Sequence, residues 1–374
     1  MEITLKAVNS RRELRRYINL PSRIHAGHRN WMPPLYMDER AYYDPLKNKA
    51  FTYCDTILLL AYRGEQPVGR AMGIINHLYN DQHQEKTARF EHLDCYEDEE
   101  VAHALLEAIE QWAREKGMEE IVGPFGFSEK DPEGFMVEGF DKLPILVTAC
   151  NLPYMPRFME SKGYEKKLDC LDFLIDIENK VPDIYPLAFE RAQRNKQFRL
   201  LEFRKTKELK PYITGVFQLV NRTYEGLYGF LPLDDDEIRE TAARYLPLLD
   251  PRFVKVILGP DGQAAAFIVG IPNMTKGIQR SGGRLLPFGI FHILRAARAT
   301  RQLDLMLGAI DEQYRGRGLD VLMGWAMIQS ARKAGIHTFE THLVLETNTR
   351  MLAEYERMGA TLHKRFRIYR KSLL

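Results

Sequence analysis

The sequence has few cysteines, little net charge and no long apolar run. Its four cysteines, Cys54, Cys95, Cys150 and Cys170, occur without CxxC or Cys/His spacing, which argues against a disulfide framework or a metal site. The net charge is only +2, so bulk electrostatics favours neither nucleic acid nor a membrane as a partner, and either would need a local basic patch. No stretch of ~18 apolar residues is present to cross a bilayer. The N-terminus also lacks the apolar core of a signal peptide, and we therefore expect a cytoplasmic protein.

Length and composition favour a two-domain globular protein. The chain has 374 residues, of which 45% are hydrophobic and 28% charged. A chain of this length can form two domains of ordinary size, each with its own core. The apolar pattern lapses over residues 178–186, where two prolines occur. We therefore predict domains at 1–178 and 179–374, joined by this linker.

Hydrophobic periodicity predicts the same order of elements in both halves. In the first half we expect strands at 55–63, 66–76, 87–96 and 120–125 and a helix at 99–116. In the second half we expect strands at 253–258, 264–271, 303–310 and 338–345 and helices at 319–334 and 349–358. Gly117 and Gly335 follow the two long helices as C-caps. The similar stretches 159–164 and 355–360 then suggest a duplicated domain.

A glycine-rich turn lies between the strand 303–310 and the helix that starts at Leu319. It reads Tyr-Arg-Gly-Arg-Gly-Leu over residues 314–319. Glycines permit positive φ and a close approach of the backbone to a ligand. The N–H groups of such a turn, the positive end of the helix and the two arginines all favour a bound anion. This arrangement is typical of a phosphate-binding cradle.

The run 310–319 resembles the strand-4 and pyrophosphate-loop motif of the GNAT superfamily of acyl-coenzyme A N-acyltransferases. Asn348, followed seven residues later by Tyr355, is similar to the second cofactor-side signature of that superfamily. The full-length layout resembles an uncharacterised group of bacterial tandem GNAT-like proteins. The resemblance implies an α/β (α+β) chain of two tandem domains, each with a mixed, mostly antiparallel central sheet flanked by helices.

The resemblance also implies roles for individual residues. Acetyl-CoA or a longer acyl-CoA would be the co-substrate, with no metal ion. Tyr355 would act as a general acid near the departing thiolate. The residues implied in cofactor binding are Ala309, Ile310, Arg315, Gly316, Arg317, Gly318, Leu319, Asp320 and Asn348. Asp320 departs from the usual small residue of the superfamily, and its carboxylate would repel a pyrophosphate at close range.

The corresponding turn of the first half is acidic. Residues 97–100 read Glu-Asp-Glu-Glu, and the position that matches Tyr355 is Met159. Carboxylates at a helix N-terminus stabilise the helix but oppose a bound pyrophosphate. We therefore expect that the first half does not bind the cofactor, and that it forms a wall of the acceptor site or supports the fold.

Aminolysis of a thioester requires a neutral amine, a polarised carbonyl and a stabilised thiolate. Glu346, at the end of the fifth strand, is our candidate base, and His342 is a second one. Tyr224, Tyr228 and Phe230 lie in a segment rich in aromatic residues and glycine, which is a candidate wall of the acceptor site.

The insertion 274–302 is longer than a turn between two strands needs. Its residues 287–301 combine apolar side chains with arginines. Three interpretations stay open: a helix packed on the core, a lid over an acyl chain, or a basic amphipathic helix at a membrane surface.

The sequence thus predicts an N-acyltransferase that acts on a small-molecule or lipid-like amine, with a single cofactor site in the second half. The alternative is a non-catalytic acyl-CoA-binding or sensing protein. A tRNA-dependent aminoacyl transfer role, and nucleic-acid binding in general, is disfavoured by the weak net charge. The identity of the amine, the acyl-chain length and the oligomeric state are not determined by the sequence.

Overall fold

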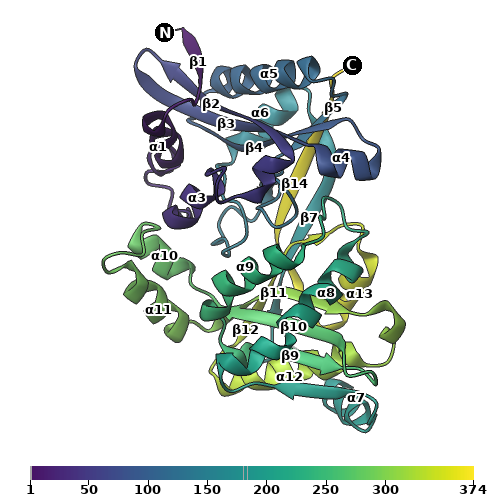
Figure 1. The fold of residues 1–374 in the computed structure, drawn as a ribbon. Coiled ribbons are helices and arrows are strands. Elements are labelled where there is room, and N and C mark those ends of the chain that lie inside the picture. Colours follow the sequence, from purple (N-terminus) through teal and green to yellow (C-terminus); the bar gives the residue numbers. More distant parts are fainter. Residues whose placement is uncertain (1, 180, 183) are drawn as a thin grey trace. The chain divides into compact units, whose positions relative to one another are not determined.

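The computed structural model describes residues 2–179, 181–182 and 184–374, and Figure 1 shows their fold. The chain divides into two compact units. Unit 1 contains residues 1–171, 274–296 and 363–374, and unit 2 contains residues 172–273 and 297–362. No helix in the described ranges is long and apolar enough to cross a membrane. It remains a prediction that residues 1–178 and 179–374 fold as independent domains.

Unit 1 is built around a sheet in the order β1-β2-β3-β4-β5-β14-β7, with β6 paired to β14. The neighbours β1 to β4 are antiparallel, whereas β4 and β5 are parallel and are connected by helix α5. The elements are β1 (Ile3–Ala7), α1 (Arg11–Asn19), α2 (Pro21–Ile24), α3 (Tyr36–Tyr42), β2 (Cys54–Arg63), β3 (Gln66–Asn76), α4 (His77–His83), β4 (Thr87–Cys95), α5 (Glu99–Glu115), β5 (Glu120–Gly123), β6 (Phe135–Glu138), α6 (Tyr154–Ser161), β7 (Glu165–Asp176), α10 (Thr275–Ser281), α11 (Gly289–Ala299) and β14 (Thr361–Ser372).

Two hydrophobic clusters cover the two faces of the unit 1 sheet. Helix α5 buries Val101, Leu105 and Ile109 against one face because these residues recur at helical spacing. Each such side chain contributes roughly 1.5–3 kcal/mol by leaving water. The segment from α1 to α3 covers the other face, where Tyr17 and Tyr36 join a second cluster.

Unit 2 repeats this topology around strands β7-β12-β11-β10-β9-β8. Strands β9, β10 and β11 are antiparallel, and β11 and β12 are parallel with α12 between them. The further elements are α7 (Ile184–Gln193), β8 (Arg199–Glu202), α8 (Ile213–Tyr224), α9 (Asp235–Tyr245), β9 (Val254–Leu258), β10 (Ala264–Pro272), β11 (Gln302–Ile310), α12 (Leu319–Lys333), β12 (Thr338–Thr341), β13 (Val344–Leu345) and α13 (Thr349–Arg357). The predicted fold class, two mostly antiparallel α/β domains in tandem, is confirmed.

Each sheet receives a strand from the other half of the sequence. In unit 1, β14 pairs with β5, with Tyr369 opposite Gly123. In unit 2, β7 pairs with β12, with Ile175 opposite Phe339. A boundary at 178/179 would therefore separate β5 from β14 and β12 from β7, while β5 stays with β4 and β12 with β11.

Two predicted segments differ in detail from the structure. The strand expected at 338–345 is divided into β12 and β13, because the chain leaves the sheet at His342 and Leu343. The insertion 274–302 forms two helices, α10 and α11. The linker expected at 178–186 includes residues 180 and 183, which lie outside the described residues, and helix α7 begins within it.

Candidate functional site

The predicted phosphate cradle is present as an exposed loop between β11 and α12. Gly316 and Gly318 have φ values of +74° and +79°, a backbone conformation that other residues rarely adopt. Gly318 is the N-cap of α12, and no side chain caps this helix end among the described residues. The first N–H groups of α12 are therefore open to an external acceptor, and they carry the positive end of the helix dipole.

The charged side chains of this loop are arranged around its outer surface. Arg315 forms an ion pair with Glu312, and the Arg317 guanidinium lies 5.7 Å from the centre of the Tyr314 ring. Both arginines are exposed, and Leu319 is buried beneath them. Asp320, in the first turn of α12, is half-buried and lies close enough to Tyr185 of α7 to help raise the pKa of that hydroxyl.

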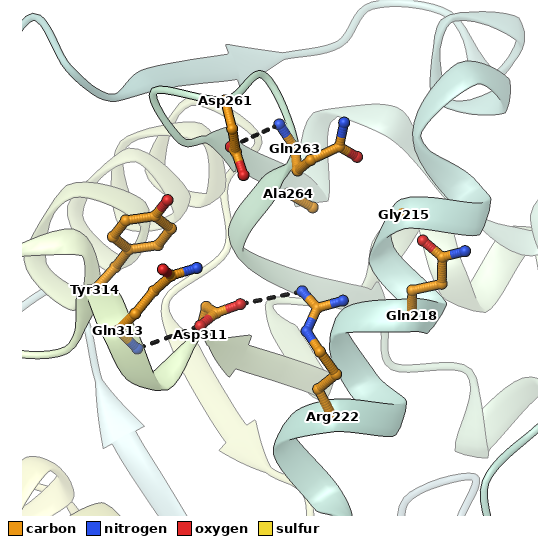
Figure 2. Close-up of a pocket in the computed structure, with 9 residues that line it drawn as sticks. All are labelled: Gly215, Gln218, Arg222, Asp261, Gln263, Ala264, Asp311, Gln313 and Tyr314. Atoms are coloured by element: carbon orange, nitrogen blue, oxygen red, sulfur yellow. Dashed lines mark hydrogen bonds and ion pairs between the residues drawn. The ribbon is translucent and has the colours of Figure 1, made fainter.

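A cavity of about 360 Å³ lies beside this loop, between helix α8 and the ends of β10 and β11 (Figure 2). Asp311 accepts a hydrogen bond from Arg222 at 3.0 Å and another from the backbone N–H of Gln313 at 3.2 Å. The cavity is lined by Gly215, Gln218, Arg222, Asp261, Gln263, Ala264, Asp311, Gln313 and Tyr314. Arg222 was not identified as a site residue from the sequence. The available signal was Asp311, because a carboxylate directly after a strand indicates that a polar partner lies nearby.

Strands β11 and β12 separate where the sequence analysis places the pantetheine arm. Their parallel pairing ends at Leu305 opposite Thr341, and the N–H of His342 donates to the Leu305 carbonyl at 2.8 Å. In the described pairing, residues 306–310 have no partner on the β12 side. Ala309 and Ile310 lie in this open stretch and pair only with β10. The free backbone edge can therefore bind an extended ligand.

Two tyrosines lie beside this open edge. The hydroxyl of Tyr224, in α8, donates a hydrogen bond to the Gly308 carbonyl at 3.0 Å. Tyr355, in α13, is buried close to Thr341, and its ring lies 5.3 Å from that of Phe173. Burial raises the pKa of the Tyr355 hydroxyl well above its usual range, and Tyr224 contributes to this shift. Tyr355 is therefore protonated at neutral pH. Thr341 was not identified from the sequence.

The other predicted residues occupy distinct positions in unit 2. The Asn348 side chain caps α13 by accepting a hydrogen bond from the Met351 N–H at 3.3 Å, which leaves its amide NH₂ group to other partners. Glu346 is half-buried after β13. Burial lowers the pKa of His342, which is therefore neutral at pH 7. Tyr228 is half-buried.

Phe230 is almost fully buried in the core of unit 2. Its ring lies 5.9 Å from that of Tyr224, with which it makes an edge-to-face contact. Phe230 therefore packs against Tyr224 from the core side. Its predicted role as a wall of the acceptor site stays a prediction.

The equivalent helix end in unit 1 is closed. Asp98 caps α5 by accepting from the Val101 N–H at 3.3 Å, and Arg63 binds both Asp98 and Glu100 at 2.8 Å. Carboxylate groups of the protein itself thus already lie at the positive end of this helix. This geometry supports the expectation that the first half does not bind the cofactor through this turn.

No protein-family model matches the chain. It is 28% identical over 380 residues to bacterial ceramide synthase of Caulobacter vibrioides, covering 100% of this chain and 98% of that protein. It is 27% identical over 372 residues to protein YghO of Escherichia coli K12, covering 97% and 94% of the two chains. Among solved structures, the tandem GNAT protein from the clavulanic acid biosynthesis pathway superposes with a TM-score of 0.58 at 13% identity, over 100% of this chain and 99% of that chain.

Proposed function

Because the chain has the fold of the GNAT acetyltransferases, we propose that it is an N-acyltransferase whose single acyl-CoA site lies in unit 2. The observation that carries the proposal is the combination of the uncapped N-terminus of α12 with the open edge of β11. The first suits a pyrophosphate and the second suits the pantetheine arm. The cofactor-binding residues are those named from the sequence, from Ala309 to Asp320 together with Asn348.

The chemistry is the aminolysis of a thioester. The amine nitrogen forms a bond to the thioester carbon, the carbon–sulfur bond breaks, and the amine proton leaves to a base. Tyr355, whose hydroxyl is protonated at neutral pH, is the candidate general acid that donates a hydrogen bond or proton to the departing sulfur. Glu346 and the neutral His342 are the candidate bases on the β12–α13 connection.

We assign the acceptor to the class of lipid-like amines. This assignment rests on the similarity over the whole chain to a protein named a ceramide synthase. A ceramide is the amide of a fatty acid with a long-chain amino alcohol, so its formation is an N-acylation of the kind described above. The tyrosine-lined edge at Tyr224 is the candidate acceptor wall.

The test is thiol release from acetyl- and long-chain acyl-CoA in the presence of amines of increasing chain length. Release that depends on a long-chain amine and is lost in Tyr355→Phe supports the proposal. Saturable acyl-CoA binding without thiol release would instead indicate the non-catalytic binding protein. Absence of binding would contradict both functions.

A further inference from the structure

Unit 1 contains a buried polar cluster around the middle of strand β4. It is formed by Tyr17 of α1, Glu39 of α3, Tyr43 at the end of α3, and Glu91 and His92 of β4. The Tyr43 ring centre lies 5.4 Å from that of Tyr17 and 5.5 Å from that of His92. The charges of Glu39 and Glu91 both act on Tyr43. These five residues therefore form one group, here called the β4 cluster.

The β4 cluster has polar atoms that the protein does not satisfy. Among the described residues, the Tyr17 and Tyr43 hydroxyls, one oxygen each of Glu39 and Glu91, and Nε2 of His92 are buried without a hydrogen-bond partner. The two hydroxyls lie close to each other but do not form a hydrogen bond of good geometry. An unsatisfied buried polar group costs about 1–3 kcal/mol, so five in one place indicate a role other than stability.

The backbone of β4 is also distorted at this point. Arg70 pairs with Asp94 and Met72 with Glu91, so β4 carries an extra residue here. His92, within this bulge, has a φ of +51°. A non-glycine residue rarely adopts this conformation, and bulges commonly redirect a side chain toward a site. The strain therefore keeps the His92 ring against Tyr43.

The charge balance of the β4 cluster favours a cation. The nearest internal cation, Arg70, is already bound to Asp94 at 2.8 Å and to the Tyr17 carbonyl at 3.3 Å. Burial raises the pKa of Glu39 to about 7 and that of Glu91 well above its usual range, and the charge of Arg70 opposes both shifts without cancelling them. Tyrosine rings beside carboxylates can hold an ammonium group, as the Tyr17 ring already does for the Arg70 guanidinium, which lies 4.9 Å from its centre.

We propose that the β4 cluster is a binding site for a protonated primary amine, in which Glu39 and Glu91 accept its N–H groups. Tyr17, Tyr43 and Glu91 are buried, whereas Glu39 and His92 are half-buried as whole residues.

Calorimetric titration of the full-length protein with 2-amino-1-octanol, without acyl-CoA, tests this site. We expect saturable binding, no binding of 1-octanol, and about tenfold or greater weakening in Glu39→Gln/Glu91→Gln. Because binding ionises Glu39, whose pKa is about 7, a proton is released near that pH, which two buffers of different ionisation enthalpy will show. Glu97→Gln, an exposed carboxylate paired with Arg157, is the matched control. Equal binding of 1-octanol, or unchanged binding in the folded double variant, would overturn the proposal.

A second, independent observation concerns the surface of helices α10 and α11. Leu286, Phe288, Phe291 and Leu294 expose 82%, 69%, 65% and 45% of their surfaces. On the opposite side of α11, Ile293 is buried so close to α10 that a Cβ on Gly277 would lie 2.7 Å from its Cα. Phe291 and Leu294 are therefore on the outer side of a tightly packed helix pair, and Leu286 and Phe288 lie in the connection between α10 and α11.

The helix pair is fixed to unit 1 and is strongly basic. The Gln279 side chain donates to the Trp31 carbonyl at 2.9 Å, and the Gly283 carbonyl accepts from the Tyr36 N–H at 3.1 Å. Residues 274–301 contain six lysines and arginines and no acidic residue. Since the whole chain has a net charge of +2, the rest of it carries a net −4. The positive charge is concentrated beside the exposed phenylalanines.

We propose that the outer face of α10 and α11 binds the surface of an anionic phospholipid bilayer. Apolar side chains next to arginines are the composition of helices that lie in the membrane interface. The negative lipid headgroups complement the basic segment, and the remainder of the chain, which is acidic, is repelled. Among the three interpretations of the insertion, this proposal adopts the membrane surface.

Co-sedimentation with vesicles tests the surface. Vesicles that contain phosphatidylglycerol should bind the protein, salt should weaken the binding, and pure phosphatidylcholine should bind much less. Phe288→Ser/Phe291→Ser should reduce binding about tenfold or more, while Leu187→Ser, a residue 60% exposed on α7, should not. Equal binding by the phenylalanine variant, or no binding to anionic vesicles, would overturn the proposal.

Discussion

The guanidinium of Arg222 and the carboxylate of Asp311 form an ion pair of 3.0 Å beside the loop that binds the cofactor in our proposal. Arg222 is the only cation among the residues that line the adjacent cavity, where Asp261 and Asp311 leave a net negative charge. The pair therefore holds Arg222 away from an incoming phosphate. Asp311 also accepts a hydrogen bond from the Gln313 backbone N–H. The side-chain oxygen of an asparagine at position 311 would accept the same bond.

Asp311→Asn should strengthen acyl-CoA binding. The substitution removes a negative charge near the pyrophosphate and releases Arg222, so we expect the Kd to fall about two- to tenfold at low salt. Calorimetry at two salt concentrations measures this effect. Asp261→Asn, which changes the opposite side of the cavity, serves as a comparison. Weaker binding by Asp311→Asn would show that the ion pair supports the loop.

Tyr355→Phe should reduce acyl transfer without reducing acyl-CoA affinity. The hydroxyl acts at the departing sulfur in our mechanism, and loss of a general acid typically lowers the rate about 10²-fold or more. The ring packs against Phe173 in either case, so the melting temperature should change little. Steady-state kinetics and thermal unfolding measure these quantities. An unchanged kcat would show that the Tyr355 hydroxyl takes no part in the acyl-transfer step.

The stability of the free protein should decrease between about pH 4.5 and pH 7 because of Glu39. Its pKa rises from 4.5 to about 7 on folding. A carboxyl group whose pKa is higher in the folded state stabilises the fold while it is protonated. This contribution to the free energy of unfolding is fully present below pH 4.5 and is lost as the pH rises through 7. The effect is up to ~3 kcal/mol. Urea unfolding at pH 5 and pH 8 measures it, and Glu39→Gln should flatten the dependence. A pH dependence that is the same in the variant would contradict this assignment.

Phe366→Ala should destabilise the protein by about 3–5 kcal/mol because the ring is fully buried on β14. Arg370→Ala, an exposed position on the same strand, should cost less than ~1 kcal/mol. Denaturant unfolding of both variants tests whether the C-terminal strand is an integral part of unit 1. A small loss in Phe366→Ala would mean that β14 contributes little to unit 1.

The sequence predicts local elements well and long-range partners poorly. The strand 66–76 has the same bounds as β3, because apolar residues and a glycine turn define it. The break at His342 and Leu343 was missed because the apolar pattern continues through it. The pairing of β14 with β5 could not be inferred, since periodicity identifies strands and not their neighbours.

The candidate site shows the same limit. The loop residues Arg315 to Gly318 could be found because they are contiguous and carry a recognisable motif. By contrast, Thr341 lies near Tyr355, and Glu39 and Glu91 both lie near Tyr43, only through the fold. No spacing in the sequence brings such residues together.

The most direct test of the account is calorimetric titration of the full-length protein with acyl-CoA. We predict one site per chain and a Kd that rises about tenfold or more in Arg315→Glu, with unchanged binding in Arg239→Glu, a charge reversal on the exposed face of α9. Two sites per chain, no binding, or an unaffected Arg315→Glu variant would contradict a single cofactor site at the β11–α12 loop.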